Sequence, residues 1–89
     1  MYKVCYLDSA EADLKDLDRP IRKRIMDKID EVLAQDPKGL GKPLTGSFSG
    51  LWRYRIGDYR VIYKIAEKEI LVVVARIGHR KDIYRRLNN

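Results

Sequence analysis

Arginine, histidine and tyrosine side chains that can act on a phosphodiester gather in two segments of this 89-residue sequence. The segment "RYRIGDYRVIY", residues 53–63, carries three arginines, and "GHRKDIYRR", residues 78–86, adds His79, Arg80 and Tyr84. Guanidinium groups hold the negative charge that builds on a phosphorus under attack. Histidine and tyrosine side chains move protons. Together these residue types can cleave RNA without a metal ion, by taking a proton from the 2′-OH and delivering one to the leaving 5′-oxygen.

A predicted hairpin places the arginines. Apolar and polar residues alternate through 51–56 and again through 59–65, and Gly57-Asp58 can close a two-residue turn between them. In this register Arg55 lies opposite Arg60, and Arg53, Arg55, Arg60 and Lys64 share one face of the sheet. Opposed arginines cost several tenths of a kcal/mol unless an anion lies between them. The alternative is that these long side chains spread into solvent.

The second segment follows a predicted central strand. The run "ILVVVARI", 70–77, is nearly continuous apolar sequence, typical of a strand buried on both faces. We expect a turn at Gly78 to bring His79 and Arg80 over the arginines, with Tyr84 one helical turn further on. Each residue also has an ordinary interpretation: a surface histidine, an apolar plug at Tyr84, a salt bridge for Arg76, and a basic tail at Arg85 and Arg86.

The rest of the chain predicts the scaffold. Residues 2–7 are expected to form a strand, followed by a helix over about 9–17 that a capping box of Asp8 and Glu11 would start. A second helix is expected from the N-cap Asp18 to about Gln35, and 36–50 is predicted to be irregular, with Leu44 and Phe48 available to pin it to the core. We predict one α+β domain, 1–89, of order β-α-α-β-β-β(-α), with a mainly antiparallel sheet and two helices on one face.

Composition narrows the possible partners. Residues 1–50 hold nine Lys/Arg and nine Asp/Glu, whereas 51–89 hold ten and four, so the whole net charge of +6 lies in the C-terminal half. Such a surface attracts polyanions or an acidic protein, although it can also serve solubility alone. A single cysteine and the lack of a long apolar run favour a cytoplasmic protein with no membrane contact. One Cys and one His do not form a usual zinc site, and we expect no cofactor.

Two patterns resemble a known family. Residues 50–60 read Gly-x-Trp-Arg-x-Arg-x-Gly-x-Tyr-Arg, and 76–80 read Arg-Ile-Gly-His-Arg. Both are similar to patterns of the RelE/ParE superfamily of bacterial and archaeal toxins, and to RelE in particular. The resemblance implies a toxin of a toxin–antitoxin pair that enters the ribosomal A site, cuts the mRNA there without a metal ion, and so inhibits translation and growth. It also implies a RelB-like antitoxin as partner, encoded nearby.

The resemblance also implies roles for single residues. The predicted catalytic residues are Arg55, Arg60, His79, Arg80 and Tyr84. Arginines stabilise charge at the phosphate, because a guanidinium is a poor base. The histidine is implied as acid or base, and the tyrosine as base or stacking residue. The predicted RNA-binding residues are Arg53, Lys64, Lys81, Arg85 and Arg86, and no residue is predicted to bind a metal.

Two other functions fit the same sequence. One is a ParE-like inhibitor that binds DNA gyrase and cuts no RNA, since a shared fold does not decide function. The other is a non-catalytic module whose basic face only binds the antitoxin, through an amphipathic helix and acidic segments of that partner. The set of His79, Arg80 and Tyr84 favours RNA cleavage over both.

Overall fold

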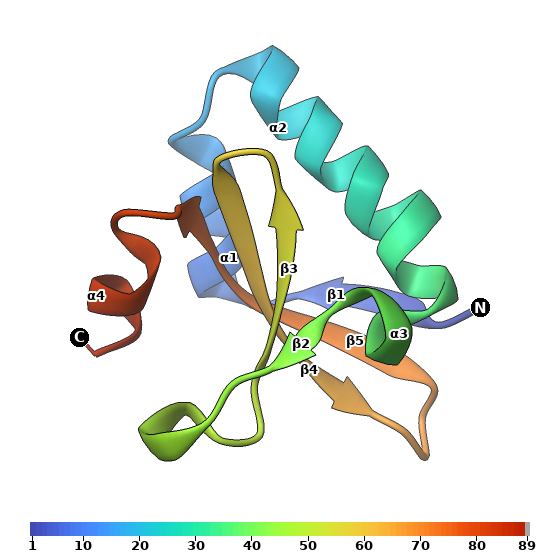
Figure 1. The fold of residues 1–89 in the computed structure, drawn as a ribbon. Helices are drawn as coiled ribbons and strands as arrows, with labels where there is room; N and C mark the ends of the chain where they lie inside the picture. Colours follow the sequence, from blue (N-terminus) through green and yellow to red (C-terminus); the bar gives the residue numbers. More distant parts are fainter. Residues whose placement is uncertain (89) are drawn as a thin grey trace.

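A computed structural model describes residues 1–88 and shows one five-stranded sheet in the order β1-β5-β4-β3-β2 (Figure 1). The strands are β1 (Lys3–Tyr6), β2 (Lys42–Pro43), β3 (Trp52–Ile56), β4 (Tyr59–Ala66) and β5 (Leu71–His79). Strand β1 runs parallel to β5, and every other pairing is antiparallel. The predicted α+β class with a mainly antiparallel sheet is confirmed.

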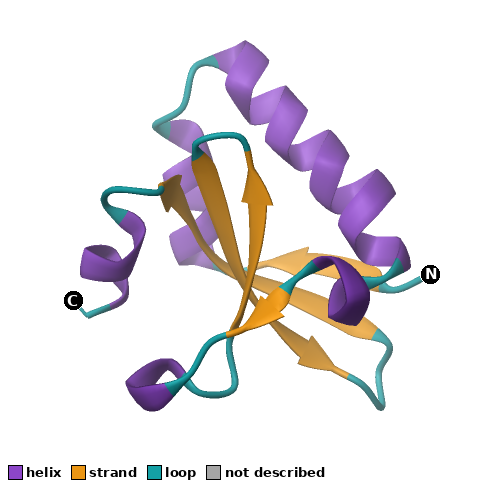
Figure 2. Cartoon of the chain, viewed as in Figure 1, coloured by secondary structure: helices purple, strands orange, loops and turns teal. Residues whose placement is uncertain are grey.

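The helices fall into two groups (Figure 2). The first group is α1 (Asp8–Lys15) and α2 (Arg19–Asp27), and α2 continues through a π-helical turn (Lys28–Val32) and a 3₁₀ turn (Leu33–Gln35). The second group is short: α3 (Pro37–Leu40), a 3₁₀ turn (Gly46–Phe48) and α4 (Ile83–Leu87). The predicted end of the long helix at Gln35 is confirmed, because Asp36 leaves helical geometry immediately before Pro37. No described helix has the length and apolar character that crossing a membrane requires.

The main core lies between the sheet and the two longer helices. Helix α2 and its extension contribute Ile25, Ile29 and Leu33, all essentially inaccessible to solvent, and α1 contributes Ala10 and Leu14. The sheet residues of this core are Ile56, Val61, Tyr63, Val72, Val74 and Ile77. Burying such side chains contributes about 1.5–3 kcal/mol each. The core therefore fixes which face of the hairpin points away from α1 and α2.

Two details of the predicted scaffold before the hairpin are wrong. The capping box does not form: Leu7 is the N-cap, because its N–H still bonds Val74 O at 2.9 Å, and Asp8 already belongs to the first helical turn. The stretch predicted to be irregular contains strand β2, which pairs with β3 at the edge of the sheet. Pro43 has no backbone N–H to donate to the sheet, and β2 has only two residues. An edge strand of this kind is therefore hard to predict from the sequence.

The register predicted for the hairpin is confirmed. Ile56 pairs with Tyr59, Arg55 with Arg60, and Arg53 with Ile62. Gly57 takes a φ of 57° in the two-residue turn, a conformation that glycine adopts without strain.

The turn predicted at Gly78 is wrong. Strand β5 continues to His79, with Gly78 opposite Arg60 and His79 opposite Tyr59. The ladder between β4 and β5 shifts register between Ile62 and Tyr63, so that β5 carries one extra residue at this point. The shift reverses which residues of β5 face the main core. Val72 and Val74, before the shift, face it with even numbers, whereas Ile77, after the shift, faces it with an odd number.

Ile70, at the turn before β5, is strained. Its φ is 51° and its residue surface is 54% exposed. A β-branched residue in the left-handed region costs about 1–2 kcal/mol. We expect Ile70→Gly to raise the free energy of unfolding by about 1 kcal/mol, since the relief of strain exceeds the added backbone entropy and little apolar burial is lost. Urea denaturation measures this, and an unchanged or lower value would show that Ile70 is not strained.

Candidate active site on the basic face of the sheet

The sheet face opposite the main core carries two rows of cross-strand partners. One row runs Lys42, Arg53, Ile62 and Arg76 across β2 to β5, and the next runs Arg55, Arg60 and Gly78. We call Lys42, Arg53, Arg55 and Arg60 the basic face. Lys42, Arg53 and Arg55 line a pocket of about 110 Å³ together with Leu40. Lys42 was missed from the sequence, because its membership depends on strand β2.

Arg60 lies on β4, the central strand of the sheet, and is only 8% exposed. Its Nη1 donates to two backbone carbonyls, Gly57 O and Tyr59 O, both at 3.0 Å. Burial lowers the pKa of Arg60, and the positive charges of Arg55, Arg53 and Arg80 lower it further. A guanidinium nevertheless keeps its proton at any physiological pH. The fold therefore holds a buried positive charge among other positive charges.

No carboxylate offsets this charge within the described chain. The salt bridges of residues 1–88 involve neither Arg53, nor Arg55, nor Arg60. A buried charge without a counter-ion is costly. An arrangement of this kind suits an anion that comes from outside, such as a phosphate with several oxygens to accept charge-assisted hydrogen bonds.

Arg55→Gln is expected to stabilise the protein at low ionic strength. The substitution removes the exposed charge directly opposite Arg60, and like charges in that position cost a few tenths of a kcal/mol. Thermal unfolding at about 10 mM salt measures the gain, and it should shrink as salt rises, because screening weakens the repulsion. A variant less stable than the parent at low salt would mean that the basic face is not repulsive.

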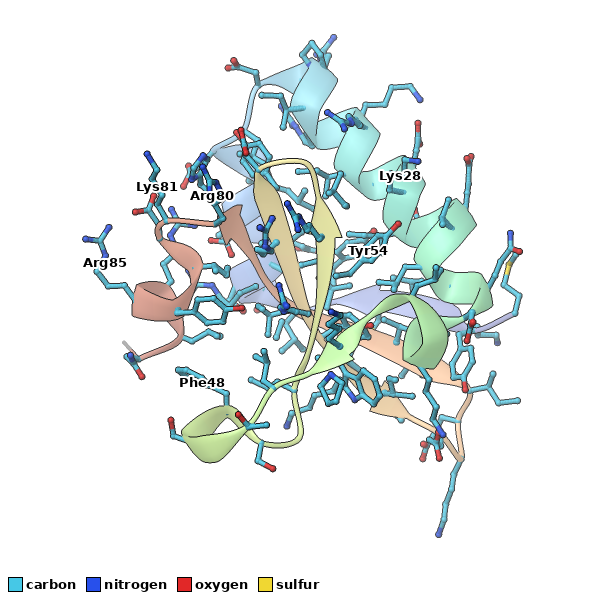
Figure 3. All side chains as sticks on the ribbon, viewed as in Figure 1. Lys28, Phe48, Tyr54, Arg80, Lys81 and Arg85 are labelled. Carbon is cyan, nitrogen blue, oxygen red and sulfur yellow. The ribbon has the colours of Figure 1, made fainter. Side chains whose placement is uncertain are left out.

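Tyr84 of α4 lies beside the basic face. It lies close enough to Arg60 that a negative charge on its phenolic oxygen would raise the pKa of the Arg60 guanidinium, against the lowering by the surrounding arginines. Its ring lies 6.2 Å from the ring of Phe48, at a tilt of 34°. Figure 3 shows Phe48 on the loop between β2 and β3, next to α4. The sequence predicts that Phe48 pins its loop to the core, whereas in the structure its ring packs against Tyr84 of α4. The two rings offer an aromatic surface next to the arginines.

The structure does not bring His79 to the basic face. His79 pairs with Tyr59, which has the same facing as Ile56 on the main-core side of the hairpin, and its ring meets the Tyr59 ring edge-on at 5.8 Å. The Nδ1 atom accepts a hydrogen bond from the backbone N–H of Lys81 at 3.2 Å. The register shift in β5 is the cause, because it inverts the facing of this end of the strand.

Arg80 lies at the hairpin turn. Its backbone N–H bonds Asp58 O at 2.8 Å, and its Nε lies 3.5 Å from Asp58 Oδ1. Both side chains are more than half exposed, so this ion pair is weak and easily exchanged. Its charge still contributes to lowering the pKa of Arg60.

The remaining predicted contacts are spread over a wider surface. Lys64 is exposed further along β4, and Lys81 is exposed in the turn before α4. Figure 3 shows Arg85 extending from α4 away from the sheet, where it pairs with Asp82 at 2.8 Å. Arg86 instead binds the buried carboxylate of Asp13 at 3.0 Å. Within residues 1–88 no three His, Cys, Asp or Glu side chains gather in a way that could hold a metal ion.

Comparison with known proteins identifies related sequences over nearly the whole chain. The sequence model of a family described as ParE toxin of the type II toxin–antitoxin system parDE matches residues 4–84. Toxin RelG of Mycobacterium tuberculosis is 35% identical over 85 residues, which cover 96% of this chain and 98% of RelG. Toxin RelE of the same organism is 34% identical over 84 residues, covering 94% of this chain and 87% of that toxin.

Solved structures agree with these matches. The toxin–antitoxin complex RelBE2 from M. tuberculosis contains a chain that superposes with a TM-score of 0.85 at 32% identity, covering 89% of this chain and 98% of that one. The isolated E. coli RelE toxin superposes with a TM-score of 0.73 at 14% identity, covering 98% and 99% of the two chains, and so shares the fold.

Proposed function

The chain belongs to the RelE/ParE family of type II toxins, and we propose that it acts as a ribosome-dependent endoribonuclease that cuts mRNA in the A site without a metal ion. The observation that supports this most is the environment of Arg60, a nearly buried cation with no carboxylate partner among residues 1–88. The negative phosphate of an mRNA backbone supplies the missing counter-charge.

The proposed reaction needs only groups of this chain, the RNA and solvent water. The 2′-OH gives its proton to Tyr84 or to water, the 2′-oxygen attacks the adjacent phosphorus, the bond from phosphorus to the 5′-oxygen breaks, and that oxygen takes up a proton from water. The products are a 2′,3′-cyclic phosphate and a 5′-OH end. Negative charge on the phosphoryl oxygens is greatest in the transition state, where preorganised donors lower the barrier most.

Residue roles follow from position. Arg60 and Arg55 stabilise the charge on the phosphoryl group, and Arg53 and Lys42 bind neighbouring phosphates. Arg80 joins them by exchanging its exposed partner Asp58 for the substrate. Tyr84 takes the proton of the 2′-OH or stacks on a base together with Phe48, since unpaired bases stack on aromatic rings. We assign no catalytic role to His79, whose ring lies against Tyr59. Lys64, Lys81 and Arg85 are proposed to contact RNA outside the site.

The proposed protein partner is an antitoxin of the RelB type. Related chains have been solved as complexes, including RelBE2 from M. tuberculosis and the archaeal RelE–RelB complex from Pyrococcus horikoshii. An acidic segment of such a partner would satisfy the basic face electrostatically and exclude mRNA from it. The toxin would act in the cytoplasm, where ribosomes and antitoxin are both present.

A second candidate is inhibition of DNA gyrase, which the match to the ParE family model favours. The two functions are separated by assaying the same purified protein on ribosomes carrying a defined mRNA and on gyrase relaxing or supercoiling a plasmid. We expect cleaved mRNA and unaffected supercoiling. Intact mRNA with blocked supercoiling would assign the chain to the second function, and a protein inactive in both assays that still binds its antitoxin would be a non-catalytic module.

A further inference from the structure

Asp13 occupies an unusual place for a carboxylate. It lies on the buried side of α1, between Ala10 and Leu14, and is only 5% exposed. Four hydrogen bonds reach its two oxygens. Oδ2 accepts from Arg76 Nε and from the backbone N–H of Ile77, each at 2.9 Å, and Oδ1 accepts from Arg76 Nη2 and Arg86 Nη1, each at 3.0 Å. One buried carboxylate thus joins α1, β5 and α4.

The position of Asp13 follows from where strand β1 ends. The pairing of β1 with β5 stops at Tyr6 and Val74, which leaves the remaining edge of β5 without a strand. Helix α1 takes over this edge: Ser9 Oγ donates to Ala75 O at 2.7 Å, and one helical turn later Asp13 accepts from Ile77 N–H. The bidentate salt bridge with Arg76 already neutralises Asp13, so the structure does not need Arg86 for charge balance.

Arg86 connects this carboxylate to the short helix α4. Its Nη1 reaches Asp13 Oδ1 and lies 3.4 Å from Ile77 O. The other anchor of α4 is Ile83, which is fully buried and lies so close to Gly78 that a Cβ there would meet Ile83 Cδ1 at 3.2 Å. Tyr84 lies between these two anchors in sequence and turns its ring to Phe48. Five helical residues are too few to hold an orientation unaided.

We propose that Arg86 is a positioning residue, whose ion pair with Asp13 fixes the orientation of α4 and thereby holds Tyr84 beside Arg60. The inference rests on the proposed function for its effect on cleavage, but its structural part stands independently. A residue that touches neither the RNA nor the reacting atoms can have a large effect in this way, because displacement of a reacting group by about 1 Å can cost 100-fold in rate. This role replaces the RNA contact that the sequence predicts for Arg86.

The test compares Arg86→Met with Arg85→Met, which removes the same charge from the same helix but from an arginine whose one salt bridge within residues 1–88 is to the exposed Asp82. In Arg86→Met we expect the backbone amides of 83–87 to exchange hydrogen about tenfold faster, with β4 and β5 unchanged. We expect no such change in Arg85→Met. Equal exchange in the parent and in Arg86→Met would overturn the proposal, whatever the protein does to mRNA.

Cleavage on ribosomes gives the second readout. Arg86→Met should lower the maximal cleavage rate about ten- to hundredfold and leave the half-saturating concentration unchanged, and Arg86→Lys, which can keep the ion pair, should recover part of the rate. Arg85→Met should instead raise the half-saturating concentration. A raised half-saturating concentration with an unchanged maximal rate in Arg86→Met would show an RNA contact and contradict the proposal. If the parent cuts no mRNA, the proposed function fails while hydrogen exchange still decides the positioning role.

Discussion

Arg60→Met is expected to abolish mRNA cleavage while the protein stays folded. Arg60 is the buried donor of the basic face, and removing one preorganised donor to a developing oxyanion lowers the rate constant about 100- to 1000-fold. The side chain of methionine is long and flexible enough to fill the vacated space. Cleavage of a defined mRNA on purified ribosomes measures the loss, and expression in a growing culture should no longer arrest growth.

The stability of this variant makes the result interpretable. The pKa of Arg60 is lowered in the folded protein, so its charge costs the folded state free energy at every pH below that pKa, which includes all working conditions. The substitution removes this cost but also two hydrogen bonds to backbone carbonyls. We expect the free energy of unfolding to stay within about 1 kcal/mol of the parent. Arg60→Lys, which keeps the charge without the planar fork, should keep partial activity; a fully active Arg60→Met would remove Arg60 from the mechanism.

Asp13→Asn is expected to have the largest effect on stability, a loss of about 3 kcal/mol in the free energy of unfolding. The variant keeps the shape of the side chain but removes the negative charge to which Arg76 and Arg86 both bind. Those side chains remain 27% and 37% exposed. They can regain some hydration, so the loss lies at the lower end of the range for broken buried pairs. Urea denaturation followed by the fluorescence of Trp52 measures it.

Asp82→Asn is the matched control for this prediction. Asp82 also accepts from an arginine, but its side chain is 46% exposed and that of Arg85 is 75% exposed. Such a pair contributes about 0.5 kcal/mol or less. Similar losses in the two variants would show that the Asp13 cluster is no more important than a surface salt bridge.

The hairpin was predictable because its signals are local. Alternation of apolar and polar residues, together with Gly57-Asp58, fixes both the register and the facing of Arg55 and Arg60, and the structure agrees pair by pair. The same holds for the long helix, whose apolar stripe and terminal Pro37 give its extent. Such features depend on contacts between near neighbours in sequence.

The errors arise where the outcome depends on the partner strand. Nothing in the sequence of 70–79 marks the register shift against β4, yet this shift turns His79 away from the basic face and turns Gly78 towards α4. Strand β2 is defined only by its pairing with β3, so the position of Lys42 on the basic face could not be predicted from the sequence. Asp13 did carry a signal: it lies three residues after Ala10 and next to Leu14, on the apolar side of its helix, where an unpaired carboxylate would be too costly to bury.

The measurement that tests the central claim most directly is the mapping of mRNA ends on purified ribosomes that hold a defined codon in the A site. We predict that the parent protein produces new 5′ ends within that codon, that these ends carry a 5′-OH and need phosphorylation before ligation, and that Arg60→Met produces none. New ends outside the A site, ends bearing a 5′-phosphate, or intact mRNA with a folded parent protein would contradict the account.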